Sequence, residues 1–145
     1  ALSDLRSACR QQALDEERRA VLQAENRLAE QMLALARTLL PQLVAADRPV
    51  WLARLAAELP DHSWDEVQVR PEDVPHAQRL FPETSVTPKE SLSGGLIAVA
   101  AGGRICVDNS LEKRLERRWP EILPQLFVYV RRKVAEEDDS SATAT

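Results

Sequence analysis

Histidine, cysteine and serine side chains could build a catalytic or metal site, but in this sequence they stand apart from one another. The two histidines, His62 and His76, each lie beside a Pro-rich turn. The two cysteines, Cys9 and Cys106, lack the C-x-x-C spacing of a zinc site, so we interpret them as small apolar residues in a reducing compartment. No serine occupies the G-x-S-x-G elbow of a nucleophile. The sequence therefore predicts no catalytic residues, no metal site and no cofactor.

Two pairs of glycines, Gly94-Gly95 and Gly102-Gly103, could suggest a loop that cradles phosphate. A phosphate loop needs G-x-x-x-x-G-K-[ST], or G-x-G-x-x-G at the start of a helix, and neither pattern occurs. Gly102-Gly103 leads into a strand pattern, so no helix N-terminus faces an anion there. The glycines therefore predict turns. A small ligand-binding or enzymatic α+β domain that uses them stays open as an alternative, and it would need a pocket with converging polar groups.

The charged residues give a net charge of −4, from 23 acidic and 19 basic side chains. A general nucleic-acid binder would usually be basic, so that class is disfavoured. One basic run in the last predicted helix has glutamates interleaved, and its members are Lys113, Arg114, Arg117 and Arg118. This run is either a solvated helix face or a docking patch for an acidic protein surface. No aromatic platform that would stack bases accompanies it.

Residues 1–40 contain no Gly and no Pro, and their six acidic side chains match six basic ones. Apolar residues recur there at intervals of three, four and seven, which places them in one stripe along a helix. A long helix with so polar a start cannot be buried in a small domain, so we expect it to project and to pair with a second helix. The predicted interface consists of Leu14, Val21, Leu28, Met32, Leu35 and Leu39.

The remaining chain mixes short helix and strand patterns. Pro41 is expected to end or bend the first helix, and further helices are predicted after Pro49 and after Pro71. Alternating or β-branched apolar residues predict strands at 66–70, 85–87, 96–100 and 104–108. The last two strands flank Gly102-Gly103 and predict a β-hairpin.

A final helix follows the hairpin, with either Asn109 or Ser110 as its N-cap. Pro120 and Pro124 lie within its pattern, so we expect a kink or restart near Trp119. Its apolar stripe should pack on the hairpin and contains Leu111, Leu115, Trp119, Ile122 and Leu126. The acidic and Ser/Thr-containing end of the chain is expected to be disordered.

These elements predict an α+β fold, in which a long N-terminal helix of coiled-coil type precedes a small, mainly antiparallel sheet packed with helices. The expected domains are a projecting helix at 1–40, a globular domain at 41–134 and a disordered tail at 135–145. No apolar stretch approaches the ~18 residues that span a bilayer, and no signal-peptide pattern is present, so we expect a soluble, cytoplasmic protein. Because the sequence starts at Ala1 rather than Met, we expect further chain upstream.

The order of motifs in the second half is specific. Ser93-Gly94-Gly95 opens an apolar strand, and Gly103 through Glu116 reads G-R-I-C-V-D-N-S-L-E-K-R-L-E. These residues resemble the E subunit of the V-type/A-type rotary ATPases, where a Gly-Gly strand, a Gly-Arg-Ile strand and an Asp-Asn-Thr/Ser helix start follow in that order. The segment from Val67 to Val74 resembles the family's strand-then-helix entry, and the long charged helix at the front also resembles the family.

The resemblance implies a non-catalytic stator subunit of the peripheral stalk. Its N-terminal helix would pair with the helical G subunit, its globular domain would hold the non-catalytic B subunit of the catalytic head, and its distal N-terminal part would reach a membrane-embedded collar subunit. It implies no binding of nucleic acid and no insertion into the membrane. The related stator protein of flagellar and type III export ATPases is the alternative within the same structural class.

Overall fold

The structure is a computed structural model that describes residues 1–144. It consists of two units, residues 1–36 and residues 37 onward. The first unit is the major part of helix α1, Leu2–Leu43. Ala, Leu, Glu and Arg favour helix throughout this stretch. Gln11 and Gln12 also donate side-chain hydrogen bonds of 3.3 Å to Asp15 and Glu16, one turn further along the helix.

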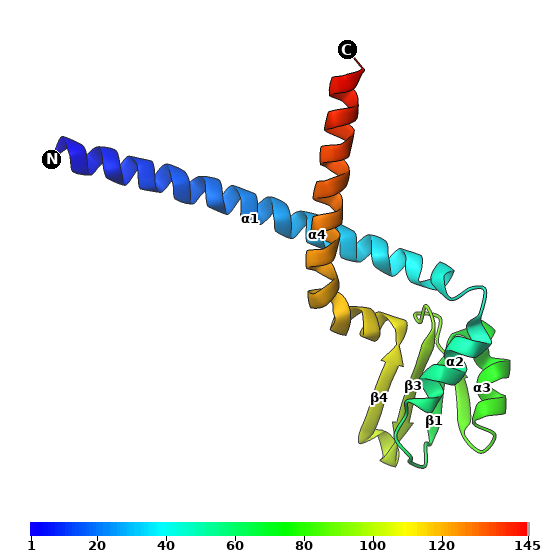
Figure 1. Ribbon diagram of the computed structural model, residues 1–145. Helices are drawn as coiled ribbons and strands as arrows, with labels where there is room; N and C mark the ends of the chain where they lie inside the picture. Colours follow the sequence, from blue (N-terminus) through cyan, green and yellow to red (C-terminus); the bar gives the residue numbers. More distant parts are fainter. Residues whose placement is uncertain (145) are drawn as a thin grey trace. The chain divides into compact units, whose positions relative to one another are not determined.

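The second unit contains the last turns of α1 and the remaining elements (Figure 1). Their bounds are α2 Arg48–Ala57, β1 Glu66–Val69, η1 Pro71–Asp73, α3 Val74–Leu80, β2 Ser85–Pro88, β3 Gly95–Ala100, η2 Ala101–Gly103, β4 Ile105–Ser110 and α4 Leu111–Thr143. The long N-terminal helix and the α+β class predicted from the sequence are confirmed. Pro49 lies in the first turn of α2, as its missing backbone donor favours.

The four strands form one mixed sheet with the order β2-β1-β3-β4. β1 pairs with β2 in parallel, and the other two pairings, β1 with β3 and β3 with β4, are antiparallel. The predicted mainly antiparallel sheet is therefore confirmed, with one parallel pair at its edge. β3 and β4 form the predicted hairpin, in which Gly95 lies opposite Ser110 and Ala100 opposite Ile105.

One face of the sheet holds the core of this domain. Alternate residues of β1 and β3 are completely buried, and α2 and α3 pack against them through Leu52 and Ala77. The sheet residues of this cluster are Val67, Val69, Leu96 and Ala98. A second cluster joins the end of α1 to the start of α4 and contains Leu40, Val44, Leu55 and Leu111. The end of α1, α2, α3 and the start of α4 therefore all contribute to the core of the domain.

Gly95 shows why the start of β3 needs glycine. Its φ is +81°, and a Cβ there would lie 2.5 Å from the carbonyl oxygen of Asn109 on β4. Gly102 in the hairpin turn also has a positive φ, +64°, but a Cβ there would meet nothing within 4 Å. Both glycines serve backbone geometry, as the sequence predicted, and Gly95 in addition allows the two strands to approach each other.

Three expectations about helix ends need correction or refinement. α1 does not end at Pro41 but continues to Leu43. Pro120 and Pro124 both lie inside α4, whose ribbon changes direction in its yellow-to-orange part (Figure 1). The stretch expected to be a disordered tail is helical up to Thr143 in the structure, while Thr145 lies outside the described residues.

Local side-chain contacts accompany this helical end. Lys133 Nζ lies 3.0 Å from Glu136 Oε2, one turn away on α4. Further along, the hydroxyl groups of Ser141 and Thr143 donate to the backbone carbonyls of Asp138 and Asp139. Ala and Glu at 135–137 are good helix formers, so the charge of this segment does not prevent a helix from continuing.

Candidate partner-binding surfaces

The apolar stripe of α1 is the first candidate surface. Positions seven residues apart lie almost above one another on a helix, so the predicted interface residues share one side of α1. Among them Val21 is 52% exposed and Leu35 60% exposed. Leu14, Leu28 and Leu39 are also exposed, and Met32 is half-buried. The stripe therefore presents apolar side chains to solvent along most of α1, which is what a surface awaiting a helical partner requires.

The basic run of α4 is the second candidate surface, and the structure divides it. Lys113 pairs with Glu116 on the same helix at 3.2 Å. Arg114 turns to the domain instead, where it pairs with Glu58 of the segment after α2 and donates to Asn109 Oδ1 at 3.1 Å. The exposed remainder consists of Arg117 and Arg118, and Arg118 lies 3.2 Å from Glu121.

Asn109 is the centre of the network that holds Arg114. Its side chain is 6% exposed, and its Nδ2 donates to the carbonyl oxygen of Leu55 at 2.9 Å and to Glu58 Oε2 at 3.3 Å. The hydrogen bond from Arg114, together with that from Asn109, lowers the pKa of Glu58 below its ordinary value. The N-cap of α4 is Ser110, whose Oγ accepts from the backbone N–H of Lys113, so Asn109 instead ties α2 to β4.

A buried carboxyl group lies on the other side of α2. Asp73 in η1 is 3% exposed, and its Oδ1 has no hydrogen-bond partner within the described residues. Burial raises the pKa of Asp73 above its ordinary value, although the positive charge of Arg48 acts in the opposite direction. A small cavity of about 10 Å³ adjoins both side chains and Gly95. This volume is at the limit for one water molecule.

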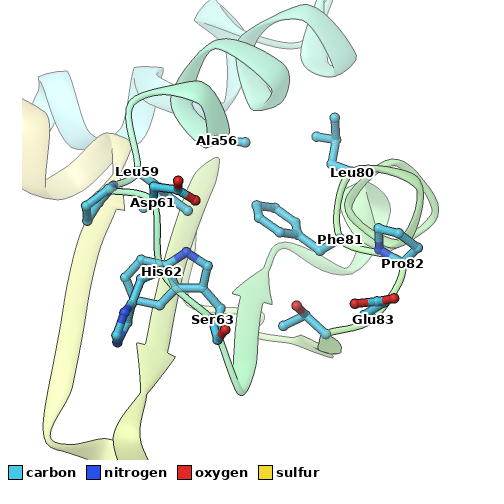
Figure 2. Close-up of a pocket in the computed structure, with 12 residues that line it drawn as sticks. Ala56, Leu59, Asp61, His62, Ser63, Leu80, Phe81, Pro82 and Glu83 are labelled. Carbon is cyan, nitrogen blue, oxygen red and sulfur yellow. The ribbon is translucent and has the colours of Figure 1, made fainter.

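A groove of about 560 Å³ lies on the described domain (Figure 2). The loop after α2 forms one wall, with Leu59, Asp61 and His62, and the loop after α3 forms the other, with Phe81 and Glu83. Sequence reasoning missed this site, because its residues come from two loops about twenty positions apart. The available signal in the sequence was an aromatic residue beside a proline, as in Phe81-Pro82.

Within residues 1–144 no group of three His, Cys, Asp or Glu side chains is arranged to hold a metal ion. No helix in the same range is long and apolar enough to cross a membrane.

Fold and surfaces together define a class of protein: a small α+β domain attached to a long amphipathic helix that leaves its apolar stripe exposed. No family model matches the chain. The chain is 40% identical over 106 residues to a protein from Geotalea uraniireducens (strain Rf4) that is named as the E subunit of a V-type ATP synthase. This alignment covers 73% of the present chain and 57% of that protein.

The chain is therefore homologous to the E subunit of V-type ATP synthases, and the resemblance drawn from its motifs is confirmed. It spans 57% of the length of the curated relative that it matches. The name of that relative favours the rotary ATP synthase over the export ATPase.

Proposed function

We propose that this chain is a non-catalytic peripheral-stalk subunit of a V-type or A-type ATP synthase or ATPase. In this role it links the catalytic head to the membrane part and resists the torque of the rotor. The observation that carries the proposal is the 40% identity to an E subunit. The exposed stripe of α1 supports it, because a stalk helix needs a partner along its length. The chain would act in the cytoplasm, peripheral to a membrane-bound complex.

Three parts of the chain would divide this work. Residues 1–40 would pair with the helical G subunit of the stalk and continue toward the membrane-embedded collar subunit. Residues 41–134 would dock on the non-catalytic B subunit of the head. A contact that holds against torque should be wide and partly apolar, so charges such as Arg117 would act mainly on the rate of association. The segment 135–145 would lie beyond the docking domain.

Mixing the chain with the helical stalk subunit of its own complex tests the pairing. Helicity measured by circular dichroism and the melting temperature should both exceed the sum of the separate chains, because the stripe of α1 becomes covered. Copurification of tagged chain should retain the stalk and head subunits of the ATP synthase. A chain that gains nothing on mixing and retains an export ATPase instead would contradict the proposal.

Head docking is tested separately with the exposed part of the basic run. The double variant Arg117→Glu/Arg118→Glu should bind the head subcomplex with a lower association rate at low salt, and the loss should shrink as salt rises. Arg104→Glu, in the hairpin turn, is the control: it also replaces a positive charge by a negative one, but away from α4, and should change the association rate less. Unchanged kinetics of the double variant at low salt would show that these arginines form a solvated face and that docking uses another surface.

The absence of a phosphate-loop pattern leads to one further expectation. Calorimetric titration of the isolated chain with ATP and ADP should show no binding in the micromolar range. Micromolar affinity would instead support the alternative of a small ligand-binding α+β domain.

A further inference from the structure

Backbone hydrogen bonds hold both loops that form the groove after α2 and α3. The backbone N–H of Leu59 donates to the carbonyl of Ala56, which closes α2, and the N–H of Thr84 donates to the carbonyl of Phe81, which closes a turn. Pro82 occupies the second position of that turn, where its fixed φ is favoured. The groove is therefore formed before any ligand arrives, and little ordering of the chain would oppose binding.

Aromatic rings line this groove. Trp64 and Phe81 are both half-buried and pack against the domain core, so their positions are fixed from behind. His62 meets Trp64 edge-on, with 5.5 Å between the ring centres and 81° between the planes. The ring of Phe81 points into the space between the two walls (Figure 2). Aromatic faces of this kind attract a cation or a planar guanidinium group.

The charges of the groove have one sign. Asp61 lies on the first wall and Glu83 on the second, and no Lys or Arg lines the space between them. Within residues 1–144 neither carboxylate takes part in a salt bridge. Two other acids of the domain, Glu58 and Glu72, are by contrast each paired with arginine. Two unengaged carboxylates therefore flank an aromatic surface.

We propose that this groove is a docking site for an arginine-bearing, extended segment of a partner protein. The guanidinium group would stack on the aromatic surface, and the negative charges of Asp61 and Glu83 on the two walls would attract it. The chain itself holds an arginine near an aromatic ring elsewhere, because the guanidinium carbon of Arg54 lies 5.8 Å from the ring centre of Trp51. This proposal concerns a surface apart from the stripe of α1 and the basic run of α4, and it does not depend on the stalk function.

The test uses the full chain, labelled with ¹⁵N, and a blocked pentapeptide that carries two arginines among alanines. Titration followed by NMR should shift the indole N–H of Trp64 and the amides of both walls, with weak affinity because the contact is small. The same peptide with citrulline in place of arginine should bind at least about threefold more weakly, since it lacks the charge. The double variant Asp61→Asn/Glu83→Gln should weaken arginine-peptide binding about tenfold.

Asp4→Asn/Glu30→Gln is the matched control, because it removes the same charge from exposed positions of α1. It should leave the affinity unchanged. The proposal is overturned if both double variants lose affinity equally, if the shifts spread over the acidic residues of the whole chain, or if citrulline peptide binds as well as arginine peptide. It is also overturned if no groove signal shifts at roughly millimolar peptide, the weakest affinity range expected for such a contact. The citrulline comparison uses the natural chain and needs no variant to fold.

Discussion

The sheet domain buries its large apolar side chains, whereas the first 36 residues leave theirs largely exposed. In the domain Val67, Val69 and Leu96 are completely buried, and Leu52 is 2% exposed. In residues 1–36 no large apolar side chain is buried. Similar residue types therefore form a closed core in one region and an open stripe in the other.

This difference separates the residues that hold the fold from those that are available for binding. Burial of apolar area stabilises a fold by about 25 cal/mol per Å², and the domain obtains this gain from its own sheet and helices. The stripe of α1 gains little stabilisation from burial in the isolated chain. Its apolar pattern therefore needs another explanation, which a partner helix provides. Substitutions of apolar residues should therefore fall into two groups, with large effects on stability in the domain and small ones in residues 1–36.

The largest effect is expected for Leu96→Ala on β3. Leu96 is completely buried between the sheet and its covering helices, so the variant loses apolar burial and leaves a cavity, at a cost of about 2–5 kcal/mol. Urea denaturation followed by circular dichroism measures the free energy of unfolding. Leu14→Ala is the control, since Leu14 is 44% exposed, and it should cost far less. Equal losses at the two positions would show that the stripe is packed like the core.

The two hairpin glycines should differ in the same measurement. Gly95→Ala forces a positive φ on alanine and brings a Cβ against the backbone of Asn109, so we expect a loss of more than about 2 kcal/mol. Gly102→Ala has the positive φ but open space, which gives about 1 kcal/mol. If both variants lose the same amount, the close approach of β3 and β4 at Gly95 is not a source of strain.

A smaller loss is expected for Asn109→Ala. The substitution leaves the carbonyl of Leu55 and the guanidinium of Arg114 without this partner, which should cost about 1–3 kcal/mol. Glu116→Gln, which breaks the exposed pair with Lys113, is the control and should change stability by less than about 1 kcal/mol. An Asn109→Ala variant as stable as this control would mean that solvent replaces the buried hydrogen bonds.

The sequence predicted most of the fold because the local signals were strong. The long helix follows from forty residues without Gly or Pro, and the hairpin follows from apolar runs around Gly102-Gly103. The parallel β1–β2 pair was not predicted, since a four-residue strand carries no signal for its direction. The helical end of α4 was missed because composition alone does not report pairs such as Lys133 with Glu136.

The candidate surfaces were predictable only in part. The stripe of α1 is a periodic pattern and could be read directly from the sequence. The basic run of α4 could also be read from the sequence. That Arg114 faces the domain while Arg117 and Arg118 stay exposed could not, because the partners of Arg114 are 5 and 56 positions away. The groove depends on two loops that only the fold brings together, as Asp61 and Glu83 show. Whether the predicted residues contact partner proteins stays a prediction.

The buried Asp73 gives a pH-dependent prediction. Its pKa in the folded chain is raised by burial, so the stability it contributes is full below the unfolded value and is lost as pH rises through the folded pKa. Asp73→Asn does not titrate, so its stability relative to the natural chain should improve from about pH 3 to about pH 7. The comparison is made by urea denaturation at both values.

The neighbouring carboxyl group supplies a control of opposite sign. The hydrogen bond from Arg70 lowers the pKa of Glu72 in the folded chain, so the stability that Glu72 contributes is present above the unfolded value and is lost as pH falls through the folded pKa. Glu72→Gln should therefore become less stable relative to the natural chain between the same two pH values. Parallel shifts of both variants would contradict the burial of Asp73.

The smallest effect on the isolated chain, and the sharpest test of the comparison, is expected for Val21→Asp. Val21 is 52% exposed, so the free energy of unfolding should stay within about 0.5 kcal/mol of the natural value. With the helical stalk partner, however, an aspartate in the stripe would bury an unpaired carboxylate, and affinity should fall at least about tenfold. Gln23→Asp, about 200° around the helix from Val21 by helix geometry, adds the same charge and should leave pairing nearly unchanged. If Val21→Asp destabilises the isolated chain, the stripe is already covered; if both variants weaken pairing equally, charge rather than the stripe controls it.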